Sequence, residues 1–298
     1  TGTVNPWQLG IAAYEHALAH GLVSRLGAKV IGITKEDSGY RICTEREEIT
    51  ASTVVNCAGT GAVKIQEMLY PSPVQLRLDG SDFLVFDPGT PHPSHVVLEE
   101  TESGKGITAV PCIEGNLLLD SPQRPYRPDN ATTAEGLETI REHASRLLPE
   151  LDLGGVIRSF GGVRPNPEYA DGRSVKDFCI ERPAVNLWSL IGIKTPGLTC
   201  ACELGSYIAA QCAELLGAGR NDAFTPYRSA IRAQDGSPIL CQCQQITRDE
   251  VLEAIRRGAV NIDGVKRRLG TGMGRCQGSR CAFEISRLLT EEGRDGSI

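Results

Sequence analysis

The sequence has no uninterrupted apolar run that approaches the roughly 18 residues needed for a membrane-spanning helix. It also has no internal repeat and no low-complexity tract, and its first six residues lack the pattern of a secretory signal peptide. These absences argue against membrane-spanning, repeat and secreted classes. They favour an ordinary soluble protein of about two domains, with a smaller third one at the C-terminal end.

An excess of positive charge is missing as well. The 298 residues carry 31 Lys and Arg against 37 Asp and Glu, a net charge of −6, which argues against a nucleic-acid partner. Eleven cysteines include apolar positions such as Cys57 and Cys212, a usage that suits a reducing cytoplasm better than a disulfide scaffold. We therefore expect a cytoplasmic protein, or one held at the inner membrane through a partner.

Four cysteines near the C-terminal end carry the strongest signal. Cys241 and Cys243 form one close pair, and Cys276 and Cys281 form a second pair after thirty-two intervening residues. Two thiolate pairs brought together by a short folded segment make a tetrathiolate site for an iron–sulfur cluster or zinc. Structural zinc sites prefer wider spacing than Cys-x-Cys, so an iron–sulfur cluster is favoured and zinc is the alternative. Basic residues outnumber acidic ones by eight to four across 241–281, which offsets an anionic cluster.

The segment 239–290 resembles the BFD-like (bacterioferritin-associated-ferredoxin-like) [2Fe-2S] domain, in its cysteine spacing and in the Gly-Met-Gly-Arg-Cys-Gln-Gly stretch that ends at Gly278. The resemblance implies a small all-α domain with a [2Fe-2S] cluster on the four cysteines. The sequence independently predicts its helices. A capping box at 247–250 starts one that stops near Gly258, Asn261 caps a second that ends at Gly270, and a third begins near Gly278.

The rest of the chain predicts a mixed α/β body. Helices are expected at about 6–21, 62–69, 133–148 and 199–217. Strands are expected at 28–35, 40–45, 48–53, 54–57, 74–79, 82–86, 95–100, 106–112, 116–119, 156–163, 177–181 and 187–193. A glycine- and proline-containing stretch at 219–238 predicts a linker.

A complete dinucleotide-binding fingerprint is missing. Gly59 and Gly61 supply two glycines of that pattern, but the third is absent, so the signal is weak. A general base is not evident either, because His92 and His95 lie in no recognisable catalytic context.

The body resembles the superfamily of FAD-dependent glycerol-3-phosphate dehydrogenase and D-amino-acid oxidase. The matching stretches occur in family order, and with the C-terminal domain they are most similar to the large subunit of the anaerobic glycerol-3-phosphate dehydrogenase type. They are residues 3–9, 54–59, 105–108, 115–117, 161–165 and 193–199. The resemblance implies an FAD-binding part at 1–72 and 188–218, which is incomplete, and an antiparallel β-rich substrate domain at 73–187.

The resemblance also assigns residues. The FAD side would be held by Asn56, Ala58, Gly59, Lys194, Pro196, Gly197, Leu198 and Thr199. The last five lead into a helix N-terminus, whose amides can stabilise negative charge on a reduced flavin ring. Arg164 resembles the arginine that clamps the substrate anion, because a guanidinium fork suits a carboxylate or phosphate. Lys176 and Lys194 are candidates to assist it, and a surface role is the alternative for both.

One departure from the family pattern is large. Members begin with a strand, a Gly-x-Gly-x-x-Gly turn and a helix that bind the FAD pyrophosphate, and these 298 residues contain none of them. We therefore expect the missing nucleotide-binding half in the same polypeptide or on another chain, and little FAD on these residues alone. The complete protein is expected to be an enzyme, while catalysis by this part alone stays open.

Two classes of function remain. In the first, a dehydrogenase oxidises a small anionic hydroxy substrate such as glycerol 3-phosphate and passes electrons through the [2Fe-2S] cluster to an acceptor protein or a quinone-reducing subunit. Within this class the substrate could instead be 2-hydroxyglutarate, an opine or an amino acid. In the second, the chain is a non-catalytic electron-transfer or scaffold subunit that keeps the fold.

Overall fold

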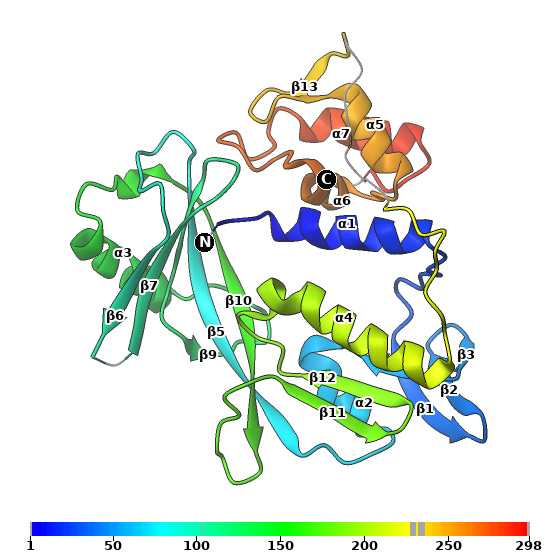
Figure 1. Cartoon of the computed structure of the whole chain (residues 1–298). Coiled ribbons are helices and arrows are strands. Elements are labelled where there is room, and N and C mark those ends of the chain that lie inside the picture. Colours follow the sequence, from blue (N-terminus) through cyan, green and yellow to red (C-terminus); the bar gives the residue numbers. More distant parts are fainter. Residues whose placement is uncertain (1, 103, 227–230, 232–235, 297–298) are drawn as a thin grey trace.

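The computed structural model describes residues 2–102, 104–226, 231 and 236–296. Its longest feature is an antiparallel ribbon of β5 (Val74–Phe86) and β10 (Val156–Tyr169), which pair along their whole length (Figure 1). Arg164 on β10 lies opposite Asp79 on β5. The ribbon forms one side of a six-stranded antiparallel sheet with strand order β10-β5-β8-β7-β6 and with β9 paired to β5. The other strands are β6 (Val97–Thr101), β7 (Gly104–Pro111), β8 (Leu117–Asp120) and β9 (Arg124–Pro125).

Helix α3 (Ala134–Leu147) covers this sheet, and the largest core of the body lies between them. The sequence predicted a cap at Thr132, and the structure has it one residue later, where Thr133 accepts a hydrogen bond from the Gly136 amide. The short 3-10 turn η2 (Leu153–Gly155) then leads into β10. The core contains Leu84, Phe86, Ile107, Ala109, Leu117, Leu119, Ile140, Ala144 and Leu151.

Two strand predictions were wrong in extent. The segments 74–79 and 82–86 form a single strand, because the backbone stays extended through Gly80 while it pairs with Val163. The strand predicted at 156–163 continues to Tyr169 and includes Pro165 and Pro167. Proline is tolerated there because β10 is the edge strand of the sheet.

A smaller sheet has the order β11-β12-β4, with β11 (Cys179–Ala184), β12 (Leu187–Ile191) and β4 (Val54–Asn56). Strand β12 runs parallel to β4 and antiparallel to β11. After β4 follow η1 (Gly59–Gly61) and α2 (Ala62–Gln66), which ends earlier than the predicted helix to about residue 69. A three-stranded meander precedes them: β1 (Val30–Glu36), β2 (Gly39–Thr44) and β3 (Glu48–Ala51).

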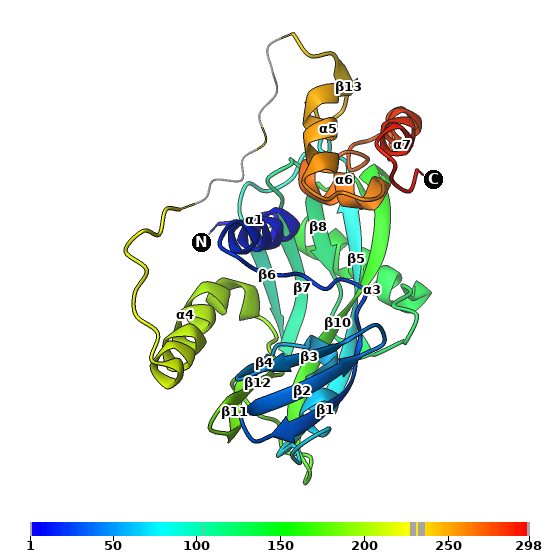
Figure 2. The same cartoon turned by 90° about the vertical axis from the view of Figure 1, so that its right-hand side faces the viewer.

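Helices α1 (Pro6–Ala19) and α4 (Gly197–Leu216) complete the body. Asn5 caps α1 by accepting from the amides of Trp7 and Gln8, as predicted. In both views α1 lies between α4 and the C-terminal domain (Figures 1 and 2). Among the described residues, no helix combines the length and the apolar character needed to cross a membrane.

The C-terminal domain begins with the short antiparallel pair β13 (Ile239–Cys241) and β14 (Ile246–Thr247). The expectation of an all-α domain was therefore wrong in this detail, because the chain pairs with itself around the first two cysteines. The predicted capping box at Thr247 is present, and three helices follow: α5 (Arg248–Arg256), α6 (Ile262–Leu269) and α7 (Ala282–Glu291). The predicted linker at 219–238 includes residues 227–230 and 232–235, which lie outside the described residues. The division into domains stays a prediction.

Candidate functional site

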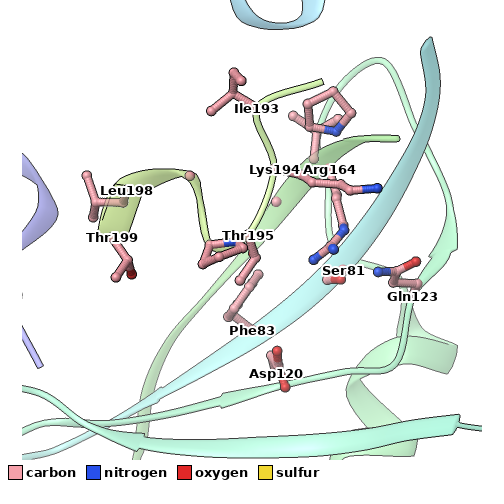
Figure 3. Close-up of a pocket in the computed structure, with 15 residues that line it drawn as sticks. Ser81, Phe83, Asp120, Gln123, Arg164, Ile193, Lys194, Thr195, Leu198 and Thr199 are labelled. Carbon is pink, nitrogen blue, oxygen red and sulfur yellow. The ribbon is translucent and has the colours of Figure 1, made fainter. Parts of the chain in front are cut away.

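A cavity of about 650 Å³ lies where the β5–β10 ribbon meets the loop before α4. Its walls come from strands β5, β10 and β8, from the turn after β8, from that loop and from the first turn of α4 (Figure 3). The lining residues are Ser81, Phe83, Asp120, Gln123, Gly162, Val163, Arg164, Pro165, Ile193, Lys194, Thr195, Pro196, Gly197, Leu198 and Thr199. The structure therefore brings Arg164 together with Lys194 and the start of α4, although they are separated by about thirty residues in the sequence.

Arg164 is held by a buried polar chain. Its Nε donates to Oδ1 of Asn166 at 3.2 Å, and Nδ2 of Asn166 donates to Oδ2 of Asp79 at 2.7 Å. Asn166 is 8% exposed and Asp79 is 7% exposed, and Arg77 pairs with the other oxygen of Asp79. No described residue bonds to the two Nη atoms of Arg164, which leaves that edge of its guanidinium for a ligand. Figure 3 shows the guanidinium directed toward Ser81. The sequence placed Arg164 at the end of a strand, but it lies within β10.

Lys194 adds a second positive charge beside Arg164. Its Nζ donates to the Val175 carbonyl at 3.2 Å. The pKa of Lys194 lies below its ordinary value, chiefly because burial disfavours the charged ammonium, and the nearby Arg164 and Arg77 add repulsion. An anion that binds between two neighbouring cations attracts both of them and offsets their mutual repulsion, so its binding is favoured.

The first turn of α4 supplies backbone donors to the same cavity. Pro196 precedes the helix, and within the described chain no side chain caps its first amides. Such amides, together with the helix dipole, favour a negative group. A Cβ at Gly197 would lie 2.7 Å from Cγ2 of Ile193, so any larger residue here would force the Ile193 side chain to move.

The far wall is fixed by aromatic stacking and by a buried ion pair. Phe83 stacks on Phe160 with ring centroids 4.7 Å apart and an interplanar angle of 4°. Asp82 is fully buried and accepts hydrogen bonds from Arg124 and Thr133, which fixes the segment that carries Gln123. Burial alone would raise the pKa of Asp82, but the bonds from Arg124 and Thr133 lower it overall.

Four of the sequence candidates lie outside the cavity lining. Asn56 is buried and donates to the Ala62 carbonyl at 2.8 Å and to Ser189 Oγ at 3.1 Å, so its side chain joins β4 to β12. Ala58 and Gly59 form an exposed turn beyond β4, where a Cβ on Gly59 would meet nothing within 4 Å. Lys176 is exposed and does not line the cavity.

Several residues of the cavity gave no signal in the sequence. Ser81, Phe83, Asp120 and Gln123 line it, and Asn166 holds Arg164. They come from ordinary strand and turn sequences, and only the pairing of β5 with β10 and β8 places them together. The glycine pair at 161–162 was the one local hint, because it permits close approach of the backbone.

The four cysteines of the C-terminal domain form two thiol pairs. Sγ of Cys243 lies 3.5 Å from Sγ of Cys276, and Cys281 is hydrogen-bonded to Cys241. For comparison, two thiolates bound to one tetrahedral metal, with metal–sulfur bonds of about 2.3 Å, lie roughly 3.8 Å apart. The 3.5 Å between the sulfurs of Cys243 and Cys276 is close to that separation. Gly274 packs directly against the side chain of Cys243, where any Cβ would collide with it.

The two pairs differ in environment. Cys241 and Cys281 belong to the hydrophobic core of the domain, and burial raises the pKa of Cys281 to about 11, with the charge of Cys241 adding to the effect. For Cys276, burial is outweighed by hydrogen bonds from the Gly278 amide and from Cys243, so its pKa is lowered. Cys276 thus has a stronger thiolate character than Cys281.

These pairs fit a two-iron cluster better than a single metal ion. A [2Fe-2S] cluster holds each iron with two thiolates, so two separate pairs of sulfurs match its ligand set.

Comparison with known families accounts for both parts of the chain. Residues 1–211 match the family model described as FAD dependent oxidoreductase, and residues 239–291 match the model of the BFD-like [2Fe-2S] binding domain. The chain therefore belongs to the FAD dependent oxidoreductase family and carries a BFD-like domain at its C-terminal side. Both resemblances drawn from the sequence are confirmed.

Two relatives among curated proteins have related names. The chain is 32% identical to the glycerol 3-phosphate dehydrogenase of Caloramator mitchellensis over 98% of its own length and 65% of that protein. It is 25% identical to one named subunit of the anaerobic glycerol-3-phosphate dehydrogenase of Escherichia coli K12, over 97% of its length and 62% of that protein. The chain thus spans a little under two thirds of each relative.

A solved structure shares the fold. The glycerol-3-phosphate dehydrogenase of Bacillus halodurans, solved with FAD, superimposes with a TM-score of 0.59 at 20% identity, covering 97% of this chain and 58% of that one. At this identity the match supports the mixed α/β architecture with antiparallel sheets.

The bond from Asn166 to Asp79 should stabilise the ribbon measurably. Asn166→Leu keeps the side-chain size but leaves the buried Asp79 carboxylate without one of its donors, which costs about 1–3 kcal/mol. We expect the urea midpoint for loss of the body's tertiary signal to fall accordingly. An unchanged midpoint would show that the polar chain behind Arg164 contributes nothing to folding.

Anaerobically purified protein should contain two irons and two sulfides per chain. Cys276→Ser should lose most of the iron, because oxygen replaces a thiolate ligand. Cys212→Ser, in α4 and outside the four-cysteine set, is the matched control and should keep it. Stoichiometric zinc without iron, even after anaerobic reconstitution, would contradict the cluster assignment.

Proposed function

We propose that this chain is the C-terminal portion of an FAD-dependent dehydrogenase of the glycerol-3-phosphate dehydrogenase type. The substrate is a small anionic hydroxy compound, and electrons leave through the [2Fe-2S] cluster. The observation that carries the proposal is the cavity in which Arg164 and Lys194 face the first turn of α4. One wall thus offers two cations and the other offers helix amides, which suits an anion beside a redox-active ring.

The residues present fit the ring end of FAD. The first amides of α4 have no side-chain cap among the described residues, and the aromatic wall of Phe83 is flat and fixed by its stack on Phe160. The Gly197 amide donates to the Lys194 carbonyl, so we propose that Leu198 and Thr199 present the backbone donors to the ring edge. When bound, FAD would supply the hydride-accepting chemistry that protein side chains lack.

Arg164 is the proposed anchor of the substrate anion. Because Asn166 fixes Nε, the Nη edge keeps one orientation and can form a two-pronged bond with a phosphate or carboxylate. Lys194 completes the cationic end. Ser81 and Gln123 lie on the same side of the cavity and can bond to hydroxyl groups of the substrate. Lys176, outside the cavity, is the least supported of the three basic candidates.

The nucleotide end of FAD requires a segment beyond these residues, supplied in the same polypeptide or by another chain. Strand β4 is a three-residue edge strand that runs parallel to β12, and Val55 on it is 40% exposed. Parallel sheets are normally extended and covered on both faces. We propose that a strand of the nucleotide-binding half adds beside β4.

Partners for electron transfer follow from the relatives. The Escherichia coli relative is named as one subunit of its enzyme, which supports an assembly with further subunits. We propose an electron-acceptor protein or a quinone-reducing subunit that takes electrons from the BFD-like domain. An assembly of this kind could hold the protein at the inner membrane.

Arg164→Ala is the direct test of the substrate site. In the complete, flavin-loaded protein, kcat/KM for glycerol 3-phosphate should fall by about tenfold to a hundredfold or more, because a charge-assisted bond is lost. Flavin content should stay the same. Arg164→Lys should recover part of the loss, since lysine carries the charge without the fork. Steady-state kinetics with measured flavin content checks both variants.

Lys176→Ala is the matched control, because it removes a positive charge that lies outside the cavity. Its kcat/KM should stay near that of the wild type. An unchanged kcat/KM in Arg164→Ala, measured with the best substrate, would make Arg164 a structural residue. If the complete protein binds flavin but neither a hydroxy compound nor an amino acid reduces that flavin, the alternative of a non-catalytic electron-transfer subunit is favoured.

The isolated 298-residue chain should carry far less than one FAD per molecule, because it lacks the glycine-rich turn that cradles the pyrophosphate. Flavin fluorescence after denaturation of the purified chain measures this content. A value near one per chain would show that other residues hold the nucleotide.

A further inference from the structure

Helix α1 is largely apolar, yet the one residue it buries is charged. All of its residues, Pro6–Ala19, are described, and Glu15 alone among them is buried, with 8% of its surface exposed. Exposed apolar side chains on the same helix include Trp7 and Leu9. Burying a carboxylate is unfavourable unless it is paired, so the surroundings of Glu15 must compensate.

Two arginines of the C-terminal domain provide that compensation. Nη1 of Arg257 lies 3.5 Å from Oε2 of Glu15, and Nε of Arg268 lies 3.7 Å from Oε1. Both guanidiniums are largely buried, with side chains 21% and 11% exposed. Gln8, two turns earlier on α1, donates to the Arg268 carbonyl at 3.1 Å. We call this set the α1 contact.

A second contact lies beside the cysteines. Nε of Arg275 is 3.6 Å from Oδ2 of Asp87, which directly follows the end of β5. Asp87 is four residues from Phe83 in the cavity wall, or about 13 Å along an extended strand. The residue after Arg275 is Cys276, whose sulfur lies 3.5 Å from that of Cys243. The segment that carries Cys276 therefore lies beside the end of β5, a strand that lines the cavity.

We infer that Glu15 is a positioning residue that fixes the C-terminal domain on the body, so that the segment carrying Cys276 stays beside the Phe86 end of β5, a strand that lines the cavity. The Arg275–Asp87 pair has a smaller part, because the Arg275 side chain is 86% exposed and solvent screens it. The idea that this placement serves electron transfer between the cavity and the cluster rests on the proposed function. The docking of the C-terminal domain on α1 is argued from the contacts alone and does not depend on that function.

Hydrogen exchange on the 298-residue chain tests the docking. Glu15→Gln keeps the shape of the side chain and removes the carboxylate that Arg257 and Arg268 share. Breaking a buried ion pair favours the undocked state, so amides of α6 and of residues 270–276 should exchange about tenfold faster or more. Glu214→Gln, at an exposed position on α4, is the matched control and should change nothing.

Exchange in helix α7 distinguishes a loss of docking from a loss of domain stability, because α7 has no residue in the α1 contact. Its amides should keep their wild-type exchange in Glu15→Gln. Equal acceleration in α6 and α7 would mean that Glu15 supports the folding of the domain, which would overturn the inference. Unchanged exchange in α6 would overturn it as well.

A second measurement uses the complete, flavin-loaded protein. After substrate is added, Glu15→Gln should slow the appearance of the reduced-cluster EPR signal while flavin bleaching and the cluster midpoint potential stay the same. Cluster reduction at the wild-type rate would remove the positioning role. Absence of cluster or flavin would instead contradict the proposed function, and the exchange result would still stand.

Discussion

The pairing of β5 with β10 is the constraint on which the rest of the body depends. Its register places Arg164 opposite Asp79 and brings both strands to the cavity. A slip of one residue would turn Arg164 to the other face of the sheet, because side chains alternate along a strand. Two glycines secure the approach: a Cβ on Gly161 would collide with the Asn130 carbonyl, and one on Gly162 would come within 3.0 Å of Phe83. The position of Arg164 is thus set by backbone geometry before any charge acts.

Local features of the fold could be predicted from the sequence, because their causes lie within a few residues. Asn5 and Thr247 each cap the helix that follows, and Gly217 and Gly270 end α4 and α6 in the left-handed conformation. Cysteine spacing likewise indicated the cluster site, and short motifs indicated the family that the comparisons support.

Non-local features could not be predicted, because their partners are far away in the sequence. Asn166 acquires its role only when β10 pairs with a strand some eighty residues earlier. Asn56 is a cofactor candidate in the sequence, and only the pairing of β4 with β12 shows that its side chain joins these two strands. Glu15 does have a signature in the sequence, because it is the one acidic residue in a helix that is otherwise largely apolar. A charge in such a place indicates a partner, but not which one.

The buried acids share one physical role. Asp82 joins β5 to the segment before α3, Asp79 joins β5 to β10, and Glu15 joins α1 to the C-terminal domain. A buried ion pair adds little net stability over a well-packed apolar contact, but it is costly to separate. An apolar contact tolerates small shifts, whereas a buried carboxylate that loses its donors does not. These acids therefore destabilise incorrect arrangements of the segments they join more than they stabilise the correct one. Asp79 and Asp82 hold segments that line the cavity, and Glu15 holds the domain that carries the four cysteines.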